Sequence, residues 1–199
     1  MSRIPQPLFD TFECFHELNF LKLSNERPAV HQYLKSFEDG CRAVDSYLVV
    51  RGFLKSYAGN QSTFNSFRTH VERLLLWALI VARKPLLDLR RSDAEQFMEF
   101  CLNPPADWVG PMVKSRFKRI GGRKRLKSDE YVVNPDWMPF SCTVSKRERK
   151  MAAETMSSLS SRTYHMAQGS VAQVFAVCGS FFQHAMDEGL TEANPFRAI

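Results

Sequence analysis

The chain has 199 residues, 44% of them hydrophobic, which suits one domain or one domain with a large insertion. Its 27 Lys and Arg against 21 Asp and Glu give a net charge of +6, a balance that suits nucleic acid or another anionic partner. Five scattered cysteines without a Cys-x-x-Cys pair argue against a disulfide framework or a zinc site and favour a reducing compartment. The N-terminus lacks a signal-peptide pattern, and the longest apolar run, residues 74–82, is too short to span a bilayer. We therefore expect a cytoplasmic protein with no membrane partner, no metal and no cofactor.

The first part of the chain predicts helices. Residues 1–28 mix Pro and Phe, and we expect a short amphipathic helix or an arm that docks elsewhere. From Val30 to Tyr57 apolar residues recur at three- and four-residue steps, which is typical of one helix. A Gly-Asn turn signal then ends it, within residues 56–62.

A second helix is predicted to begin at Ser62 or Thr63, both good N-caps, and to end before Lys84-Pro85. Its apolar positions are regularly spaced, so the remaining positions are expected to form a solvent-facing polar side. That polar side is predicted to carry Asn65, Arg68, Thr69 and Glu72.

Two further helices follow. The third has Ser92 or Asp93 as its predicted N-cap and ends at Asn103-Pro104-Pro105. The last begins near Ser170, stops at Gly189 and is followed by an extended exit at Asn194-Pro195. No strand alternation of any length is present, so the predicted class is mainly α, with a Phe-rich core.

The segment between the third and last helices is strongly basic. Residues 103–166 hold 13 Lys and Arg against 6 Asp and Glu, whereas the rest of the chain holds 14 against 15. Within residues 114–127 there are eight bases and no acid, a pattern that favours nucleic acid over a merely solvated insertion. The predicted phosphate contacts are Lys114, Arg116, Lys118, Arg119, Arg123, Lys124, Arg125 and Lys127. We expect this segment to become ordered only on DNA.

Signatures of catalysis are scarce. The sequence has no Gly-rich phosphate loop, no His-Glu-x-x-His and no Gly-x-Ser-x-Gly, and its five histidines are scattered. We therefore expect no enzyme activity from this chain by itself and no small-molecule substrate.

Taken in order, the motifs resemble the core-binding, SAM-like domain of tyrosine recombinases, or phage integrases. Residues 60–100 match the family's Ser/Thr-rich helix start, its Leu-x-Asp-Leu link at Leu87–Leu89 and its Asp-Ala helix at Asp93-Ala94. Residues 170–196 match the final core-binding helix, with its paired aromatics, glycine and Asn-Pro exit. The stretch at 134–140 is similar to a subset of larger integrases of mobile elements.

The resemblance implies a four-helix core-binding domain over residues 29–199 with an insertion at about 103–162, preceded by an arm or short helix at 1–28. In the family, Asn-Pro leads to a catalytic domain that cleaves and rejoins DNA through a phosphotyrosine intermediate. All five tyrosines lie before that region, so none is expected to be the nucleophile and the chain is expected to be an N-terminal part of an integrase. Its implied partners are double-stranded DNA and other integrase protomers.

The resemblance also suggests which helices meet DNA. The expected contacts are Ser62, Thr63, Asn65, Arg68 and Thr69 on the second helix, with Thr163, Ser170 and Gln173 at the last. Simpler roles stay open, because Ser62 and Thr63 are also good caps and Arg68 is spaced for a surface ion pair with Glu72. Two other functions stay open: a helical module that binds an acidic protein through the basic segment, and a helix-turn-helix regulator.

Overall fold

The computed structural model describes residues 3–17, 23, 27–57, 59–122, 124, 130–142, 164 and 166–197. Its helices in these ranges are α1 (Phe12–Glu17), α3 (Pro28–Lys35), α4 (Ala43–Lys55), α5 (Gln61–Trp77), α6 (Arg91–Leu102) and α8 (Gln168–Asp187). Its strands are β1 (Val109–Pro111), β2 (Phe117–Ile120), β3 (Glu130–Val133) and β4 (Phe140–Cys142). The described chain is thus mostly helical with little sheet, which confirms the predicted class.

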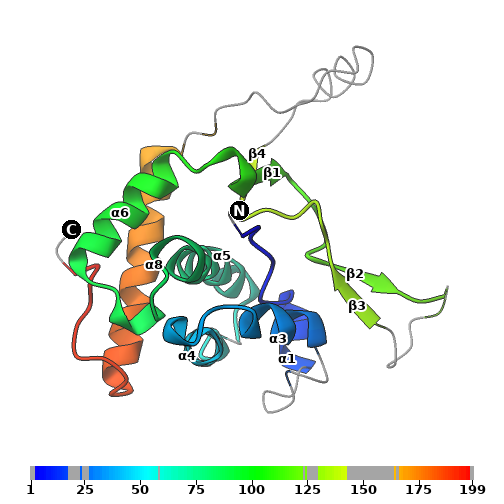
Figure 1. Ribbon diagram of the computed structural model, residues 1–199, viewed down its shortest axis with the longest axis horizontal. Coiled ribbons are helices and arrows are strands. Elements are labelled where there is room, and N and C mark those ends of the chain that lie inside the picture. The colour runs from blue at the N-terminus through cyan, green and yellow to red at the C-terminus, as the bar shows by residue number, and fades with distance from the viewer. Residues whose placement is uncertain are drawn as a thin grey trace.

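The helices pack around α5. Helices α4 and α8 both contact α5, α6 lies beside α8, α3 packs on α4, and α1 packs on α5 (Figure 1). The β2–β3 hairpin lies on the side of the molecule away from α6 and α8. No helix among the described residues is long and apolar enough to cross a membrane.

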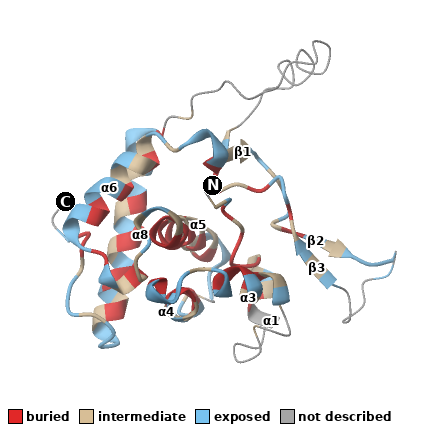
Figure 2. Cartoon of the chain, in the orientation of Figure 1, coloured by how far each residue is buried: buried red, intermediate tan, exposed pale blue. Residues whose placement is uncertain are grey.

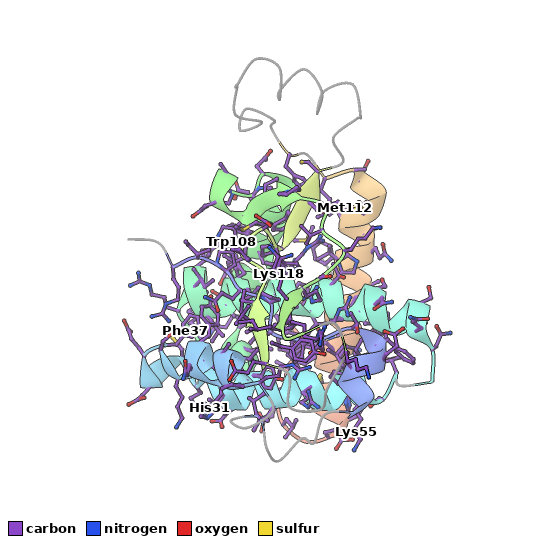
Figure 3. All side chains as sticks on the ribbon, turned by 90° about the vertical axis from the view of Figure 1, so that its right-hand side faces the viewer. His31, Phe37, Lys55, Trp108, Met112 and Lys118 are labelled. Atoms are coloured by element: carbon purple, nitrogen blue, oxygen red, sulfur yellow. The ribbon has the colours of Figure 1, made fainter. Side chains whose placement is uncertain are left out.

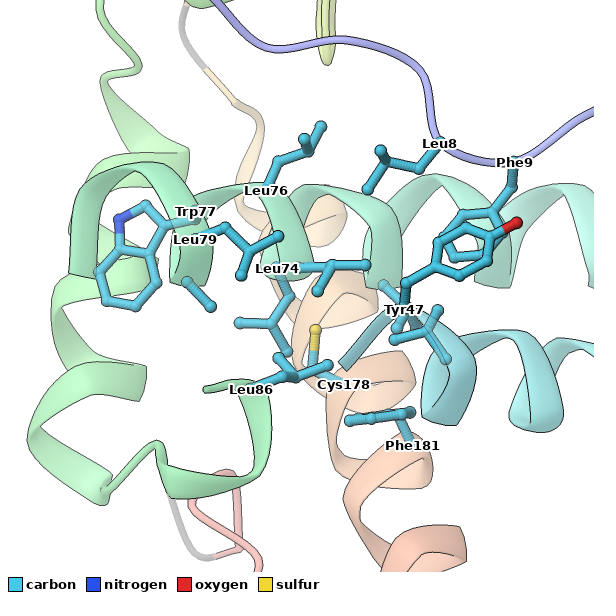
Figure 4. Close-up of a cluster of buried hydrophobic side chains, with 14 of the residues drawn as sticks. Leu8, Phe9, Tyr47, Leu74, Leu76, Trp77, Leu79, Leu86, Cys178 and Phe181 are labelled. Atoms are coloured by element: carbon cyan, nitrogen blue, oxygen red, sulfur yellow. The ribbon is translucent and has the colours of Figure 1, made fainter. Parts of the chain in front are cut away.

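The core is rich in aromatic side chains, as the sequence predicts. Buried faces of the helices turn toward one another (Figure 2), and α4, α5, α8 and residues 8–9 all contribute to the cluster in Figure 4. The Phe53 ring of α4 lies 5.4 Å from the Phe181 ring of α8 and 5.7 Å from the Phe67 ring of α5. These phenylalanines hold the helices together and are not available to stack on bases.

Three of the cysteines are buried, where a thiol side chain packs as a small apolar residue. Cys41, Cys101 and Cys178 are at most 3% exposed. Burial raises the pKa of the Cys101 thiol to about 12 and that of Cys178 well above its usual value. Neither thiol forms a reactive thiolate at neutral pH.

The prediction of one helix from Val30 to Tyr57 is wrong, because the chain breaks into α3 and α4. A short 3₁₀ turn, Asp39–Cys41, separates them, and Arg42 adopts a left-handed conformation with φ of 43°. The apolar spacing continues across the turn, so periodicity alone does not reveal the break.

The predicted caps of two helices are also wrong. Asn60 caps α5, and its side chain accepts a hydrogen bond from the Thr63 amide at 3.0 Å. Helix α6 begins after Arg90, and Asp93 in its first turn accepts from the Arg90 amide at 2.8 Å.

Two small sheets depart from the expectation of no strands. Strands β1 and β4 pair in parallel, with Val109 opposite Phe140, and β2 and β3 pair antiparallel, with Phe117 opposite Val133. The strands are three or four residues long, too short to give a visible alternation. The segment predicted as a basic loop therefore contains a β-hairpin.

The end of α8 matches the predicted stop. Gly189 has φ of 67°, and the Leu190 amide donates to the Ala185 carbonyl at 2.8 Å. The following Asn194-Pro195 is not an extended exit, because the Asn194 side chain donates from its Nδ2 to the Gly179 carbonyl at 2.9 Å and Phe196 is buried. The described chain after α8 thus folds back onto that helix.

Candidate nucleic-acid interface

Helices α5 and α8 bring predicted contact residues together. The Gln173 side-chain amide of α8 donates to the Ser66 hydroxyl of α5 at 3.0 Å, although the two lie 107 residues apart in the sequence. On α5, polar residues recur at the three- and four-residue steps of one helix face. We define the α5–α8 polar surface as Ser62, Asn65, Ser66, Thr69, Ser170 and Gln173.

The α5–α8 polar surface is uncharged and open to solvent. Ser62, Ser170 and Gln173 are exposed, while Asn65, Ser66 and Thr69 are half-buried, as is the neighbouring predicted contact Thr63. The Thr69 hydroxyl donates to the Asn65 carbonyl at 2.8 Å, which leaves its lone pairs able to accept a hydrogen bond. Sequence reasoning missed Ser66, although its position four residues after Ser62 would have identified it.

Helix α8 begins at the edge of this surface. Its N-cap, Ala167, makes no side-chain capping bond, and Gln168, Gly169 and Ser170 of the first turn are exposed. The first amides of a 20-residue helix point along its axis and carry partial positive charge. This end of the surface therefore suits an anionic group such as a phosphate.

His70 lies buried beneath the polar surface. It is 7% exposed, and its Nδ1 has no hydrogen-bond partner among the described residues. Burial, with a smaller contribution from the nearby Arg73 charge, lowers the pKa of His70 to about 4, while the Gln173 side chain acts in the opposite direction. His70 is therefore neutral at physiological pH and supports the surface by packing.

The pKa of His70 predicts a pH-dependent stability. Because the unfolded state takes up this proton near pH 6.5 and the folded state only near pH 4, stability falls as the pH drops between these values. The expected slope from this residue is at most about 1.4 kcal/mol per pH unit. We expect the variant His70→Gln to lose less free energy of unfolding between pH 6.5 and 4.5 than the wild type, measured by urea denaturation. Equal losses in the two proteins would contradict this placement of His70.

The structure contradicts the predicted position of Arg68 and Glu72 on a solvent-facing side. Arg68 is 9% exposed, and its guanidinium donates to the Asp10 carbonyl at 2.6 Å; burial lowers its pKa to about 10. Glu72 is 2% exposed and accepts from the Leu8 amide at 2.7 Å and the Phe9 amide at 3.1 Å. Residues 3–10, the N-terminal segment, cover this side of α5. The surface ion pair between Arg68 and Glu72 is therefore absent from the described structure.

Arg116, one of the predicted phosphate contacts, is the ion-pair partner of Glu72. Its Nε donates to the Phe9 carbonyl at 2.7 Å, and its guanidinium lies 4.7 Å from the Trp137 ring centre. Its side chain is only 12% exposed. Arg68 and Arg116 are both engaged within the protein, so we do not include them among the proposed DNA contacts.

The other bases of the segment lie on or near the hairpin. Lys118 pairs with Asp136 at 3.2 Å with both side chains at least 50% exposed, an arrangement that contributes little stability. Arg119 is half-buried and donates to the Gly122 and Lys124 carbonyls at 2.5 and 3.1 Å. Lys114 and Lys124 are exposed. Arg123, Arg125, Lys127 and Thr163 lie outside the described residues, as does much of the segment predicted to order on DNA.

A shallow apolar groove of about 400 Å³ lies between α4 and α8, away from these residues. Its walls include Leu48 and Phe53 of α4, Phe181 of α8 and the exposed Leu190, with His184 and Glu188 as its titratable groups. No group of three or more His, Cys, Asp or Glu side chains gathers as a metal site in the described part of the chain.

Comparisons of the chain with protein-family models, with curated proteins and with solved structures give no match.

Proposed function

We propose that the chain is a DNA-binding domain of the tyrosine-recombinase kind. The α5–α8 polar surface contacts duplex DNA at a recombination core site, and the domain serves a catalytic domain that cleaves and rejoins the strands through a phosphotyrosine. In this proposal α4, α5, α6 and α8 are the four helices of a SAM-like bundle, and residues 103–162 are an insertion between the last two. Other protomers bind the same DNA.

The observation that carries the proposal is the contact between Gln173 and Ser66. The family resemblance selects residues on two helices far apart in the sequence, and this hydrogen bond joins the selected Gln173 of α8 to Ser66, the neighbour of the selected Asn65 on α5. The two helices that the resemblance selects therefore meet at one of the selected residues, Gln173.

The chemistry of this surface suits DNA. Hydroxyl groups and the exposed amides at the start of α8 are donors for phosphate oxygens, while Asn and Gln side chains pair well with adenine edges. The surface itself carries no charge, so long-range attraction must come from elsewhere. The basic segment provides it, through exposed Lys114, Lys118 and Lys124 among the described residues.

A variant that introduces a negative charge tests the surface. We expect Ser170→Glu to weaken binding to a duplex about tenfold or more. A carboxylate at the start of α8 repels the DNA phosphates and offsets the partial positive charge by which this helix end attracts them. Ser180→Glu is the matched control, since Ser180 is also an exposed serine of α8 but lies nearly three turns further along. Fluorescence anisotropy with a labelled 30-base-pair duplex measures both. Equal affinities for the two variants would contradict the assignment of this surface.

The apolar groove between α4 and α8 favours one second candidate, a protein-interaction module. Leu190, which is 50% exposed, and the aromatic rings of Phe53 and Phe181 give this groove an apolar lining that suits the apolar side chain of a partner. Under this alternative the chain binds no duplex DNA at moderate salt, and the anisotropy experiment separates the two functions.

A further inference from the structure

The β2–β3 hairpin has two distinct faces. The antiparallel register places Phe117, Arg119, Tyr131 and Val133 on the face that turns to the helices, where Phe117 is buried and the other three are half-buried. The opposite side, here called the outer ribbon face, consists of Lys118, Ile120, Glu130 and Val132. All four of these residues are exposed. The hairpin extends away from the helices in Figure 1, and Figure 3 views the molecule from this side.

The base of the hairpin is firmly held. The Arg27 guanidinium lies 4.8 Å from the Tyr131 ring centre and 5.9 Å from that of Phe117. The Asn134 amide donates to the Arg116 carbonyl at 3.0 Å, and Arg116 itself pairs with buried Glu72 of α5. These contacts fix the direction in which the hairpin points, so its outer face is presented in one orientation.

The outer ribbon face exposes two apolar side chains beside one base, Lys118, and one acid, Glu130. Ile120 is 55% exposed and Val132 is 39% exposed, and they flank Lys118 on the two strands. Residues 114–127 around them contain eight bases and no acid, although Glu130 at the far end of β3 and Asp136 beside Lys118 are acidic. Exposed apolar side chains beside a lysine, in a part of the sequence that is rich in bases, suit the major groove of DNA, which has phosphates along its edges and thymine methyl groups in its floor.

We propose that this two-stranded ribbon enters the major groove of duplex DNA with its outer face toward the base pairs; the inference rests on the proposed function. The major groove is about 12 Å wide and admits a two-stranded ribbon, whereas the minor groove, about 6 Å wide, presents no thymine methyl groups to apolar side chains. Ile120 and Val132 contact thymine methyl groups in the groove. Lys118 leaves its exposed ion pair with Asp136, which contributes little stability, and pairs with a DNA phosphate instead.

The test uses the full 199-residue chain and a 30-base-pair duplex of mixed sequence. The double variant Ile120→Ser, Val132→Ser is expected to weaken binding about tenfold at every salt concentration, because it removes apolar contact without changing charge. Lys118→Gln is expected to lower the steepness of the salt dependence by about one. The controls are Met112→Ser, an exposed apolar residue outside the hairpin, and Lys55→Gln at the end of α4, which are expected to bind as the wild type does.

Dimethyl sulfate identifies the groove, since it methylates guanine N7 in the major groove and adenine N3 in the minor groove. The wild type is expected to protect guanine N7 positions that the double variant leaves reactive. Wild-type affinity in both ribbon variants, or protection of adenine N3 alone, would overturn the ribbon assignment. If Ser170→Glu still weakens binding in that case, the proposed function stands without the ribbon; if the wild type binds no duplex, both fail.

Discussion

Replacement of Glu72 by alanine is expected to lower the free energy of unfolding by about 3–5 kcal/mol. The Glu72 carboxylate accepts from the Leu8 and Phe9 amides and pairs with Arg116, all within a side chain that is 2% exposed. Its removal leaves two amide donors and one guanidinium without their partner in a buried site, and each loss is costly. Urea denaturation followed by circular dichroism at 222 nm measures the change.

Two variants sharpen this test. Glu95→Ala removes a carboxylate from an exposed pair with Arg91 and is expected to change the free energy of unfolding by less than about 1 kcal/mol. Glu72→Gln keeps an oxygen acceptor for the amides but loses the charge, so we expect an intermediate loss. A loss of under 1 kcal/mol for Glu72→Ala would show that this carboxylate does not hold the N-terminal segment and the hairpin to α5.

The helices that carry regular apolar spacing were predictable from the sequence. The existence of α5, α6 and α8 follows from their spacing and from breakers such as Pro85 and Gly189. The break between α3 and α4 could not be predicted from the sequence, because a three-residue turn leaves the apolar spacing undisturbed. The hairpin could not be predicted either, because strands of only four residues, surrounded by basic residues, show no clear alternation of apolar and polar residues.

The side of α5 that holds Arg68 and Glu72 shows the limit of helical patterns. Charged residues on a helix are normally solvated, so the pattern predicts exposure. Here the N-terminal segment lies over them, and Arg116 arrives from 44 residues further along the chain. Contacts over such separations depend on the tertiary fold, and spacing within one helix carries no information about them.

The candidate surface was predictable in part. Ser62, Asn65 and Thr69 share one face of α5 by spacing, and Ser170 and Gln173 share one face of α8. That these faces meet at Ser66 is visible only in the structure. The excess of basic residues in the segment could be predicted from the sequence, but the ion pair of Arg116 with the buried Glu72 could not.

The steepest expected effect on binding is that of salt. Exposed bases that replace counterions on about five phosphates give a log–log slope of affinity against salt near −4 to −5, so affinity falls roughly 500-fold between 50 and 200 mM. Neutralising Lys114, Lys118 and Lys124 together is expected to flatten the slope by up to about three.

The salt series with the wild-type chain and a 30-base-pair duplex tests the central claim most directly. Anisotropy at five salt concentrations from 50 to 250 mM gives the slope, and the neutralised variant is measured in parallel. A slope near −4 to −5 that flattens in the variant is the result that DNA binding through the basic segment predicts. No binding at 50 mM salt, or binding that is insensitive to salt, would contradict it and favour a module that binds protein.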